Sequence, residues 1–465
     1  MTKSEIGIIG LGVMGRSLAK NALSKGFHVS VYNRWTETEK DIVPDFVKEV
    51  DGRALGFTDL SAFVASLQKP RKILLMITAG SAVDSVINEL TPHLDKGDII
   101  ADGGNSHFLD TQRRVEGLKA YGIQFLGVGI SGGEKGALEG PCIMPGGNSN
   151  AYAPFQDILK AMAAKDKDGN PCVSLVGSDG AGHLVKTVHN GIEYGEMQLI
   201  ADCYAVLSPT HSNEEIATIF SNWNRGVLQS YLLGITASIL RKKNGDAYLI
   251  DKVLDKAGNK GTGSWTSQLA FQLGVPAPTI NAAVTARYLS SLKETRLRYG
   301  SKIKRTDSYE KPDAKQLEDA YLASRMINHH QGFEVIRSAS NAFGWNINLA
   351  EVARIWTEGC IIKSNFMEEC AEILQNHTSL MDQLVVFGIL TKRENAWKET
   401  IKYSLNNRIL INCISESYNY FKHITSAQSS AHIIQAQRDE FGAHTYRRND
   451  RPENESFTTN WTENG

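Results

Sequence analysis

A glycine-rich turn near the N-terminus limits the possible folds more than any other feature of the sequence. The apolar run at residues 6–10 leads into GLGVMG, in which Gly10, Gly12 and Gly15 have the GxGxxG spacing. Glycine at these positions permits a tight turn and lets a pyrophosphate approach the backbone where a helix begins. A strand, this turn and a helix together predict a dinucleotide-binding unit. The alternative is a glycine-rich turn that binds nothing.

Further apolar runs continue the pattern of short buried strands over the first 180 residues. These runs are HVSVYN, KILLMIT, DIIADGG and QFLGVGISG. Each precedes a turn or a helical segment, which is typical of a parallel α/β sheet. From about residue 182 the chain has the periodicity of long amphipathic helices, and its last stretch is polar. We therefore expect an α/β dinucleotide-binding domain over residues 1–180, a large all-α domain over residues 181–437 and an extended C-terminal tail over residues 438–465.

Composition argues against several classes of partner. The formal net charge of −1 gives no electrostatic reason to expect nucleic acid or an anionic membrane surface. No apolar run approaches the roughly 18 residues of a membrane span. The six cysteines contain no CxxC pair, and the twelve histidines show no metal-binding spacing. These features predict a cytoplasmic protein with free thiols and no metal centre.

The residues after the second predicted strand bear on the choice of dinucleotide. An NAD site usually places a carboxylate there, on the ribose 2′-hydroxyl. This chain has VYNRWTE, with Asn33 and Arg34 at the corresponding place. An arginine attracts a 2′-phosphate, which a carboxylate would repel. The sequence therefore favours NADP, although Arg34 could also be an ordinary solvated loop residue.

A predicted helix carries a polar stripe that surface exposure alone does not explain. Lys186, His189, Asn190, Glu193 and Tyr194 have helical spacing that puts all five on one face. Burial lowers the pKa of a lysine, so a neutral Lys186 could accept a proton and Glu193 could donate one. The other three side chains could bind substrate oxygens. The alternative is a polar interdomain helix with a simple Lys–Glu pair.

Two loops and three isolated cations complete the candidate residues. Asn105 in DGGNS and the Ser131, Gly132 and Gly133 of SGGEK follow predicted strands, where open α/β sheets bind ligands. Amides and hydroxyls of this kind suit a carboxylate and sugar hydroxyls, but they are also common in ordinary turns. The cations that could bind an anion are Lys260 in a glycine-rich loop, Arg287 and Arg448.

A series of motifs resembles the decarboxylating 6-phosphogluconate dehydrogenase family from end to end. In chain order they are GLGVMG, DGGNS, SGGEKGALEGPCIMPGG, KTVHNGIEYGEMQLI, DKAGNKGTGSW, SSLKETR and FGAHTY. The resemblance implies an N-terminal Rossmann domain, an all-helical domain and a homodimer in which each C-terminal tail reaches the partner subunit. It also implies the activity of the oxidative pentose phosphate pathway, which converts 6-phosphogluconate to ribulose 5-phosphate and CO2 and reduces NADP.

The resemblance assigns a role to each candidate residue. Lys186 corresponds to the general base that removes the C3 hydroxyl proton. Glu193 corresponds to the acid that protonates C1 of the enediol formed when CO2 leaves, and the reaction needs no metal. The cofactor positions are Gly10, Leu11, Gly12, Val13, Met14, Gly15, Asn33, Arg34, Trp35, Ile77, Thr78, Ala79 and Asn105. The substrate positions are Asn105, Ser131, Gly132, Gly133, His189, Asn190, Tyr194, Lys260, Arg287 and, from the partner's tail, Arg448.

Two other protein classes are compatible with parts of the sequence. NAD-linked dehydrogenases of the 3-hydroxyisobutyrate type share the glycine-rich turn and a catalytic lysine, but they are shorter and lack KGTGSW and the tail. A catalytically silent nucleotide-binding scaffold could use the same fold. Such a scaffold would have no need for both Lys186 and Glu193.

Overall fold

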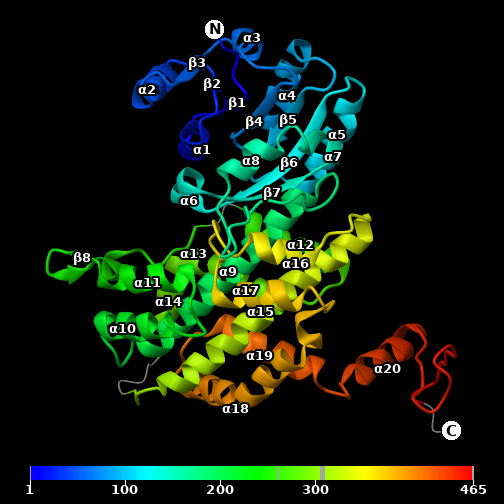
Figure 1. Ribbon diagram of the computed structural model, residues 1–465. Coiled ribbons are helices and arrows are strands. Elements are labelled where there is room, and N and C mark those ends of the chain that lie inside the picture. Colours follow the sequence, from blue (N-terminus) through cyan, green and yellow to red (C-terminus); the bar gives the residue numbers. More distant parts are fainter. Residues whose placement is uncertain (1, 259–260, 304–308, 463–465) are drawn as a thin grey trace. The chain divides into compact units, whose positions relative to one another are not determined.

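A computed structural model describes residues 2–258, 261–303 and 309–462. The chain divides into two compact units, residues 1–417 and residues 418–465. The first unit contains a β-sheet with flanking helices, followed by a large group of helices (Figure 1). This succession is the α/β and all-α arrangement that the sequence predicts.

The sheet has the strand order of a doubly wound dinucleotide-binding fold. Among the described residues it contains seven strands in the order β3-β2-β1-β4-β5-β6-β7. Strands β1 to β6 are parallel, and β7 runs antiparallel to β6. The strands are β1 (Ile6–Ile9), β2 (Val29–Tyr32), β3 (Ala54–Phe57), β4 (Lys72–Leu75), β5 (Ile99–Asp102), β6 (Gln124–Ser131) and β7 (Cys142–Gly146).

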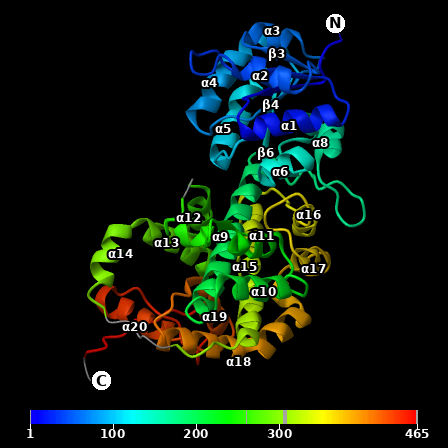
Figure 2. The same cartoon turned by 90° about the vertical axis from the view of Figure 1, so that its left-hand side faces the viewer.

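Helices cover both faces of this sheet, as Figure 2 shows. Apolar side chains of α1, α2 and α8 form a core on one face, and those of α3, α4 and α5 form a core on the other. Two buried faces explain why the central strands are almost continuously apolar. The helical elements here are α1 (Val13–Ser24), α2 (Ile42–Glu49), α3 (Leu60–Ala65), α4 (Ser81–Leu90), the 3₁₀ turn η1 (Thr91–His93), α5 (Phe108–Lys119), α6 (Gly133–Glu139), α7 (Ser149–Tyr152) and α8 (Gln156–Met162).

Three strand features were not predicted from the sequence. Strand β3 is a partly exposed edge strand, so it lacks a clear apolar run. Strand β7 contains Pro145 and Gly146, which are usual signs of a turn, but its pairing with β6 fixes it as an edge strand. A short hairpin of β8 (Lys243–Asn244) and β9 (Ala247–Tyr248) interrupts the helical region.

The helical region is built around two long helices, α9 and α15. Helix α15 begins at a cap in which Asp313 Oδ1 accepts hydrogen bonds from the backbone N–H groups of Lys315 and Gln316. It ends at Gly344, whose φ of +67° is left-handed. The helical elements are α9 (Ala181–Leu207), α10 (Asn213–Trp223), α11 (Tyr231–Arg241), the 3₁₀ turn η2 (Leu249–Lys252), α12 (Thr262–Leu273), α13 (Pro278–Ser291), α14 (Lys293–Gly300), α15 (Ala314–Phe343), α16 (Leu349–Ile355), α17 (Asn365–Ile373), the 3₁₀ turn η3 (Leu380–Asp382), α18 (Leu384–Asn406) and α19 (Asn412–Ile424).

A buried ion pair joins the two long helices. Arg325 Nε of α15 donates to Glu196 Oε2 of α9 at 3.0 Å, and both side chains are almost fully buried. The same guanidinium donates to the Leu228 carbonyl and to the Ser230 hydroxyl. A buried charge needs such partners, because desolvation would otherwise destabilise it. This network fixes α9 against α15 through residues that lie deep in the helical core.

The second unit contains helix α20 (Ala431–Gly442) and an irregular segment that returns to it. Asp439 is 3% exposed and accepts hydrogen bonds from the Thr445 and Thr459 backbone N–H groups and from Trp461 Nε1. Tyr446 and Phe457 exchange backbone hydrogen bonds across the segment. One carboxylate therefore holds the segment against α20.

No helix among the described residues is long and apolar enough to cross a membrane. The six cysteines are buried and form no disulfide. No group of three or more His, Cys, Asp or Glu side chains within residues 2–258, 261–303 and 309–462 is arranged to hold a metal ion.

Candidate active site

The glycine-rich turn lies at the carboxyl end of β1, and close contacts require glycine at two of its three positions. Gly10 has a φ of +97°, and a Cβ there would lie 2.5 Å from the Met76 carbonyl oxygen. A Cβ on Gly15 would lie 1.9 Å from the Gly10 carbonyl oxygen, so α1 can approach β1 only with glycine there. A Cβ on Gly12 would meet nothing within 4 Å. The open backbone at Gly12 and Val13, where α1 begins, fits a pyrophosphate.

The loops after β4 and β5 meet this turn at the same edge of the sheet. A Cβ on Gly10 would also lie 2.7 Å from Ile77 Cγ2, and a Cβ on Gly104 would lie 3.1 Å from the Ile77 carbonyl oxygen. Thr78 and Asn105 are exposed at this edge, and Ala79 is half-buried. The structure therefore brings the predicted cofactor residues of three loops together.

A buried carboxylate shapes the loop that carries Asn105. Asp102, at the end of β5, accepts hydrogen bonds from the Gly104 backbone N–H at 3.0 Å and from the Ser106 hydroxyl at 2.6 Å. Arg114 Nη1 donates to the same carboxylate at 3.2 Å. The charge of Asp102 is thus compensated without solvent, and the loop has a fixed shape.

The residues after β2 form a small polar cluster beside the glycine-rich turn. Asn33 Oδ1 accepts a hydrogen bond from the Leu11 backbone N–H at 3.2 Å. The Arg34 side chain is 73% exposed and forms an ion pair with Glu39. Trp35 is also exposed, at 58%. The arginine predicted to bind a 2′-phosphate therefore lies at the surface and already has a carboxylate partner.

The first turns of helix α9 pack very closely on strands β6 and β7. A Cβ on Gly182 would lie 2.2 Å from the Gly127 carbonyl oxygen and 2.4 Å from the Met144 carbonyl oxygen. A Cβ on Gly129 in β6 would lie 2.5 Å from Lys186 Cβ. These glycines let the backbone of α9 rest directly on β6 and β7. Lys186 is thereby fixed beside the strand that ends at Ser131.

Three polar side chains of α9 meet around one imidazole. His189 Nδ1 lies 3.5 Å from Lys186 Nζ, 3.4 Å from Asn190 Oδ1 and 3.7 Å from Glu193 Oε2. His189 Nε2 lies 3.1 Å from the Ser131 hydroxyl. The predicted stripe is therefore a connected cluster, and it joins the helix to the loop after β6.

Burial shifts the pKa values of this cluster in directions that suit proton transfer. Lys186 is 7% exposed, and burial lowers its pKa, while the Glu193 carboxylate opposes that shift. Burial raises the pKa of Glu193, and the positive charges of Lys186 and Arg287 oppose it. Burial also lowers the pKa of His189 well below its ordinary value. Desolvation thus favours a neutral lysine and a protonated glutamate.

The start of α12 closes one side of the cluster. A Cβ on Gly263 would lie 2.3 Å from Tyr194 Cε2, and a Cβ on Gly191 would lie 2.5 Å from Thr266 Cγ2. The Arg287 guanidinium carbon stacks 3.4 Å from the centre of the Tyr194 ring. Tyr194 and Arg287, two of the predicted substrate residues, are therefore in contact.

Two predicted substrate residues, Lys260 and Arg448, stay predictions. Lys260 is outside the described residues. Arg448 belongs to the second unit, where its guanidinium pairs with Asp450, Nε to Oδ1 at 2.8 Å. Gly132 has a φ of +116° and precedes α6, and Gly133 is the first residue of that helix.

Several contacts at the site were not predicted from single motifs. The edge of Trp265 packs on His107 with ring centres 5.0 Å apart, which connects the loop after β5 to α12. Trp356 packs similarly on His189 at 5.5 Å. Gly129 lies within the predicted strand, and glycine inside a strand is a signal of close backbone approach. That signal could have indicated the contact with Lys186.

The fold and the site together define a dinucleotide-binding protein with a buried acid–base cluster. A family model of the NAD binding domain of 6-phosphogluconate dehydrogenase matches residues 5–177, and one of the C-terminal domain of 6-phosphogluconate dehydrogenase matches residues 182–461. The chain belongs to the 6-phosphogluconate dehydrogenase family. This confirms the resemblance seen in the sequence motifs.

Individual relatives match over the whole length of the chain. It is 44% identical over 474 residues to a decarboxylating 6-phosphogluconate dehydrogenase of Escherichia coli, with 100% of both chains covered. It is 43% identical to decarboxylating 6-phosphogluconate dehydrogenase 2 of Arabidopsis thaliana, covering 98% of this chain and 97% of the relative. Among solved structures it is similar to 6-phosphogluconate dehydrogenase of Plasmodium falciparum, with a TM-score of 0.93, 37% identity, and coverage of 98% of this chain and 100% of that chain. That enzyme was studied in its apo form and in complexes with NADP⁺ and with 6-phosphogluconate.

Proposed function

We propose that this protein is an NADP-dependent dehydrogenase that oxidises and decarboxylates 6-phosphogluconate to ribulose 5-phosphate and CO2. The carrying observation is the cluster on α9, in which burial lowers the pKa of Lys186 and raises that of Glu193 beside one imidazole. Full-length similarity to decarboxylating 6-phosphogluconate dehydrogenases supports the choice of substrate and cofactor. The reaction would belong to the pentose phosphate pathway, and a cytoplasmic location stays a prediction.

The cofactor residues of this chain fit a phosphorylated dinucleotide. The open backbone at Gly12 would receive the pyrophosphate at the start of α1, and Arg34 would pair with the 2′-phosphate. Ile77, Thr78, Ala79 and Asn105 would line the path from there toward α9. NADP, when bound, accepts the hydride that leaves C3 of the substrate.

Lys186 is the proposed general base of the oxidation. Its uncharged amine takes the proton of the C3 hydroxyl as hydride leaves C3, which gives a 3-keto acid. His189 and Asn190 hold the substrate hydroxyls. The Ser131 hydroxyl, which contacts His189, binds the substrate beside them. A positioned proton acceptor of this kind typically contributes about 10²–10⁴-fold to the rate.

Glu193 is the proposed general acid of the second half. The ammonium formed on Lys186 returns its proton to the C3 carbonyl oxygen, which accepts the electrons released when C1 leaves as CO2. Glu193, held protonated by burial, then protonates the former C2 of the substrate, which is C1 of the five-carbon enediol. No step requires a metal, because the C3 ketone is the electron acceptor. Arg287 beside Tyr194 would bind the phosphate end, together with Lys260 and Arg448 of the partner's tail.

The direct test is an assay of purified protein with 6-phosphogluconate and either NADP or NAD. Formation of reduced cofactor and release of CO2 are followed together. Lys186→Met should abolish both signals while NADP still binds, and Lys119→Met, whose side chain is 65% exposed, should leave them unchanged. Normal NADPH formation by the Lys186 variant would refute the base assignment, and no CO2 from the wild type would refute the function.

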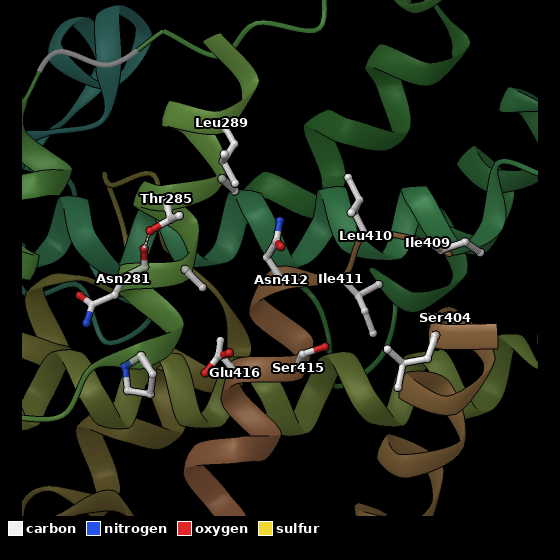
Figure 3. A pocket seen from close by; sticks show the side chains of 14 residues that line it. Asn281, Thr285, Leu289, Ser404, Ile409, Leu410, Ile411, Asn412, Ser415 and Glu416 are labelled. Atoms are coloured by element: carbon white, nitrogen blue, oxygen red, sulfur yellow. Dashed lines mark hydrogen bonds between the residues drawn. The ribbon is translucent and has the colours of Figure 1, made fainter. Parts of the chain in front are cut away.

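A homodimer is the proposed assembly, and an apolar groove of the helical region supports it. The groove has a volume of about 530 Å³ and lies between α13 and the connection from α18 to α19. Figure 3 shows Leu289 on one side of this groove and Leu410 on the other. Leu289, Leu405 and Leu410 are 51%, 75% and 74% exposed. Apolar surface gathered in this way is typical of a protein interface.

Analytical ultracentrifugation tests the assembly. The double variant Leu405→Ser, Leu410→Ser should sediment as a monomer at concentrations where the wild type is a dimer. Tyr121→Ser, which changes an exposed side chain of the sheet domain, is the control and should stay dimeric. A dimeric double variant would place the interface elsewhere.

A further inference from the structure

One carboxylate joins the two polar residues that follow β2. Glu39 Oε2 accepts a hydrogen bond from Asn33 Nδ2 at 3.0 Å and from Arg34 Nε at 3.2 Å. Glu39 Oε1 accepts a second bond from Arg34 Nη2 at 3.1 Å. Two parallel bonds from one guanidinium edge are the geometry by which arginine also grips phosphate. Glu39 therefore occupies the edge of Arg34 that an incoming phosphate would use.

Asn33 connects the Glu39 carboxylate to the glycine-rich turn by hydrogen bonds to both. Asn33 Nδ2 donates to Glu39, and Asn33 Oδ1 accepts from the Leu11 backbone N–H at 3.2 Å. The orientation of the Asn33 amide is thus set from both ends. Glu39 has two separable effects, because its oxygen orients Asn33 while its negative charge faces Arg34.

The charge of Glu39 is present at neutral pH. The hydrogen bonds from Arg34 hold the pKa of Glu39 below its usual range. The Glu39 side chain is 27% exposed and the Arg34 side chain 73% exposed, so the pair lies in partly screened surroundings. A 2′-phosphate that reached Arg34 would meet a carboxylate within a few ångströms.

We propose that Glu39 is a specificity-determining residue that competes with the 2′-phosphate of NADP for Arg34 and so limits the preference for NADP over NAD. NAD carries no 2′-phosphate, so Glu39 does not oppose its binding. NADP must displace Glu39 from the guanidinium edge or bind Arg34 through its remaining N–H groups. The inference rests on the proposed function, in which Arg34 is the 2′-phosphate ligand.

Glu39→Gln separates the two effects of this side chain. The amide oxygen of glutamine can still accept from Asn33 Nδ2 and Arg34 Nε, as Glu39 Oε2 does. The negative charge is removed, and the amide N–H₂ group cannot accept from Arg34 Nη2. Glu37 in the same loop gives a matched control, because its side chain is 75% exposed and pairs with Lys40 instead of Arg34. Glu37→Gln changes the net charge by the same amount without freeing Arg34.

The experiment measures the dissociation constants of NADP and NAD by titration calorimetry for the wild type, Glu39→Gln, Glu37→Gln, Arg34→Ala and the Arg34→Ala, Glu39→Gln double variant. We expect Glu39→Gln to tighten NADP binding about two- to fivefold, the range for one exposed ion pair. NAD binding should change less than twofold. The gain should disappear when Arg34 is absent, and Glu37→Gln should give no comparable gain.

Several outcomes would overturn the inference. Unchanged NADP binding in Glu39→Gln, or equal weakening of NADP and NAD, would mean that Glu39 only positions Asn33. A gain of the same size in Glu37→Gln would mean that general charge is responsible. If Arg34→Ala binds NADP as the wild type does, the 2′-phosphate assignment itself fails. That last result is distinct, because the other outcomes leave the effect of Arg34→Ala intact.

Discussion

Replacing Gly129 by alanine should displace the proposed general base without touching any residue that could bind the cofactor. The added Cβ would lie 2.5 Å from Lys186 Cβ and 2.9 Å from the Gly182 carbonyl oxygen. Neither atom is the free end of a flexible side chain. The first distance must grow to at least 3.4 Å, the lower edge of ordinary van der Waals contact. Helix α9 must therefore move away from β6 by about 1 Å.

The expected consequences follow from that displacement. A misplacement of about 1 Å can lower a rate roughly 10²-fold, so kcat should fall by about this factor. Overpacking should lower the free energy of unfolding by about 1–3 kcal/mol. The dissociation constant of NADP should stay within twofold, because the glycine-rich turn and Arg34 lie on other loops.

Steady-state kinetics, titration calorimetry with NADP and thermal unfolding test this prediction together. Gly117→Ala in α5 is the control, since a Cβ there meets nothing within 4 Å. It should leave kcat unchanged and stabilise the protein slightly, because alanine favours a helix. A Gly129→Ala enzyme with wild-type kcat and unfolding temperature would refute the close contact between β6 and Lys186. Intact NADP binding shows that any loss of activity is not a failure to fold.

Three further predictions concern buried ionisable side chains. Glu193→Gln should lower the rate of ribulose 5-phosphate formation about 10²–10⁴-fold while single-turnover NADPH formation persists, as rapid mixing would measure. Burial raises the pKa of Asp202 to about 7. The free energy of unfolding should therefore fall as the pH rises from about 4 to 7, by about 4 kcal/mol at most. Asp202→Asn should flatten that pH dependence in denaturant titrations. Arg325→Met should destabilise the protein by about 3–5 kcal/mol by leaving Glu196 buried and unpaired, and Glu196→Gln in addition should restore part of the loss.

The sequence predicted the parts of the molecule that repeat a local pattern. The parallel strands β1, β2, β4, β5 and β6 were visible as apolar runs, and the polar face of α9 was visible as helical spacing from Lys186 to Tyr194. Strand β7 was missed because Pro145 and Gly146 contradict the local strand signal, and only its pairing with β6 overrides it. The helical spacing did not show that the polar face of α9 would be buried together with its apolar face. Its apolar face packs in the core, but Lys186, His189 and Asn190 are buried as well.

No local signal identified both partners of the contacts that position the proposed site residues. The pair between Arg34 and Glu39 joins residues of one irregular loop, where no periodicity tells which carboxylate will face the guanidinium. Glu37 was an equally good candidate on sequence alone. The position of Lys186 depends on Gly129, which is far away in the chain and belongs to another element. Such contacts follow from how the elements pack, so they require the structure.

The burial of Lys186 and Glu193 together determines which of the two side chains carries the proton. Seven residues of helix separate their Cα atoms by about 10 Å along the axis, yet both head groups approach His189 Nδ1. A neutral lysine with a protonated glutamate has the same net charge as an ion pair, so burial changes where the proton lies without changing the total charge. The opposite pKa shifts of the two groups have the same cause, desolvation, and each group's charge only opposes the shift of the other. Admitting water to this cluster would therefore favour the ion pair and remove the proposed base and the proposed acid together. The proposed chemistry therefore depends on the close packing of α9 on β6 and α12 as much as on the two side chains.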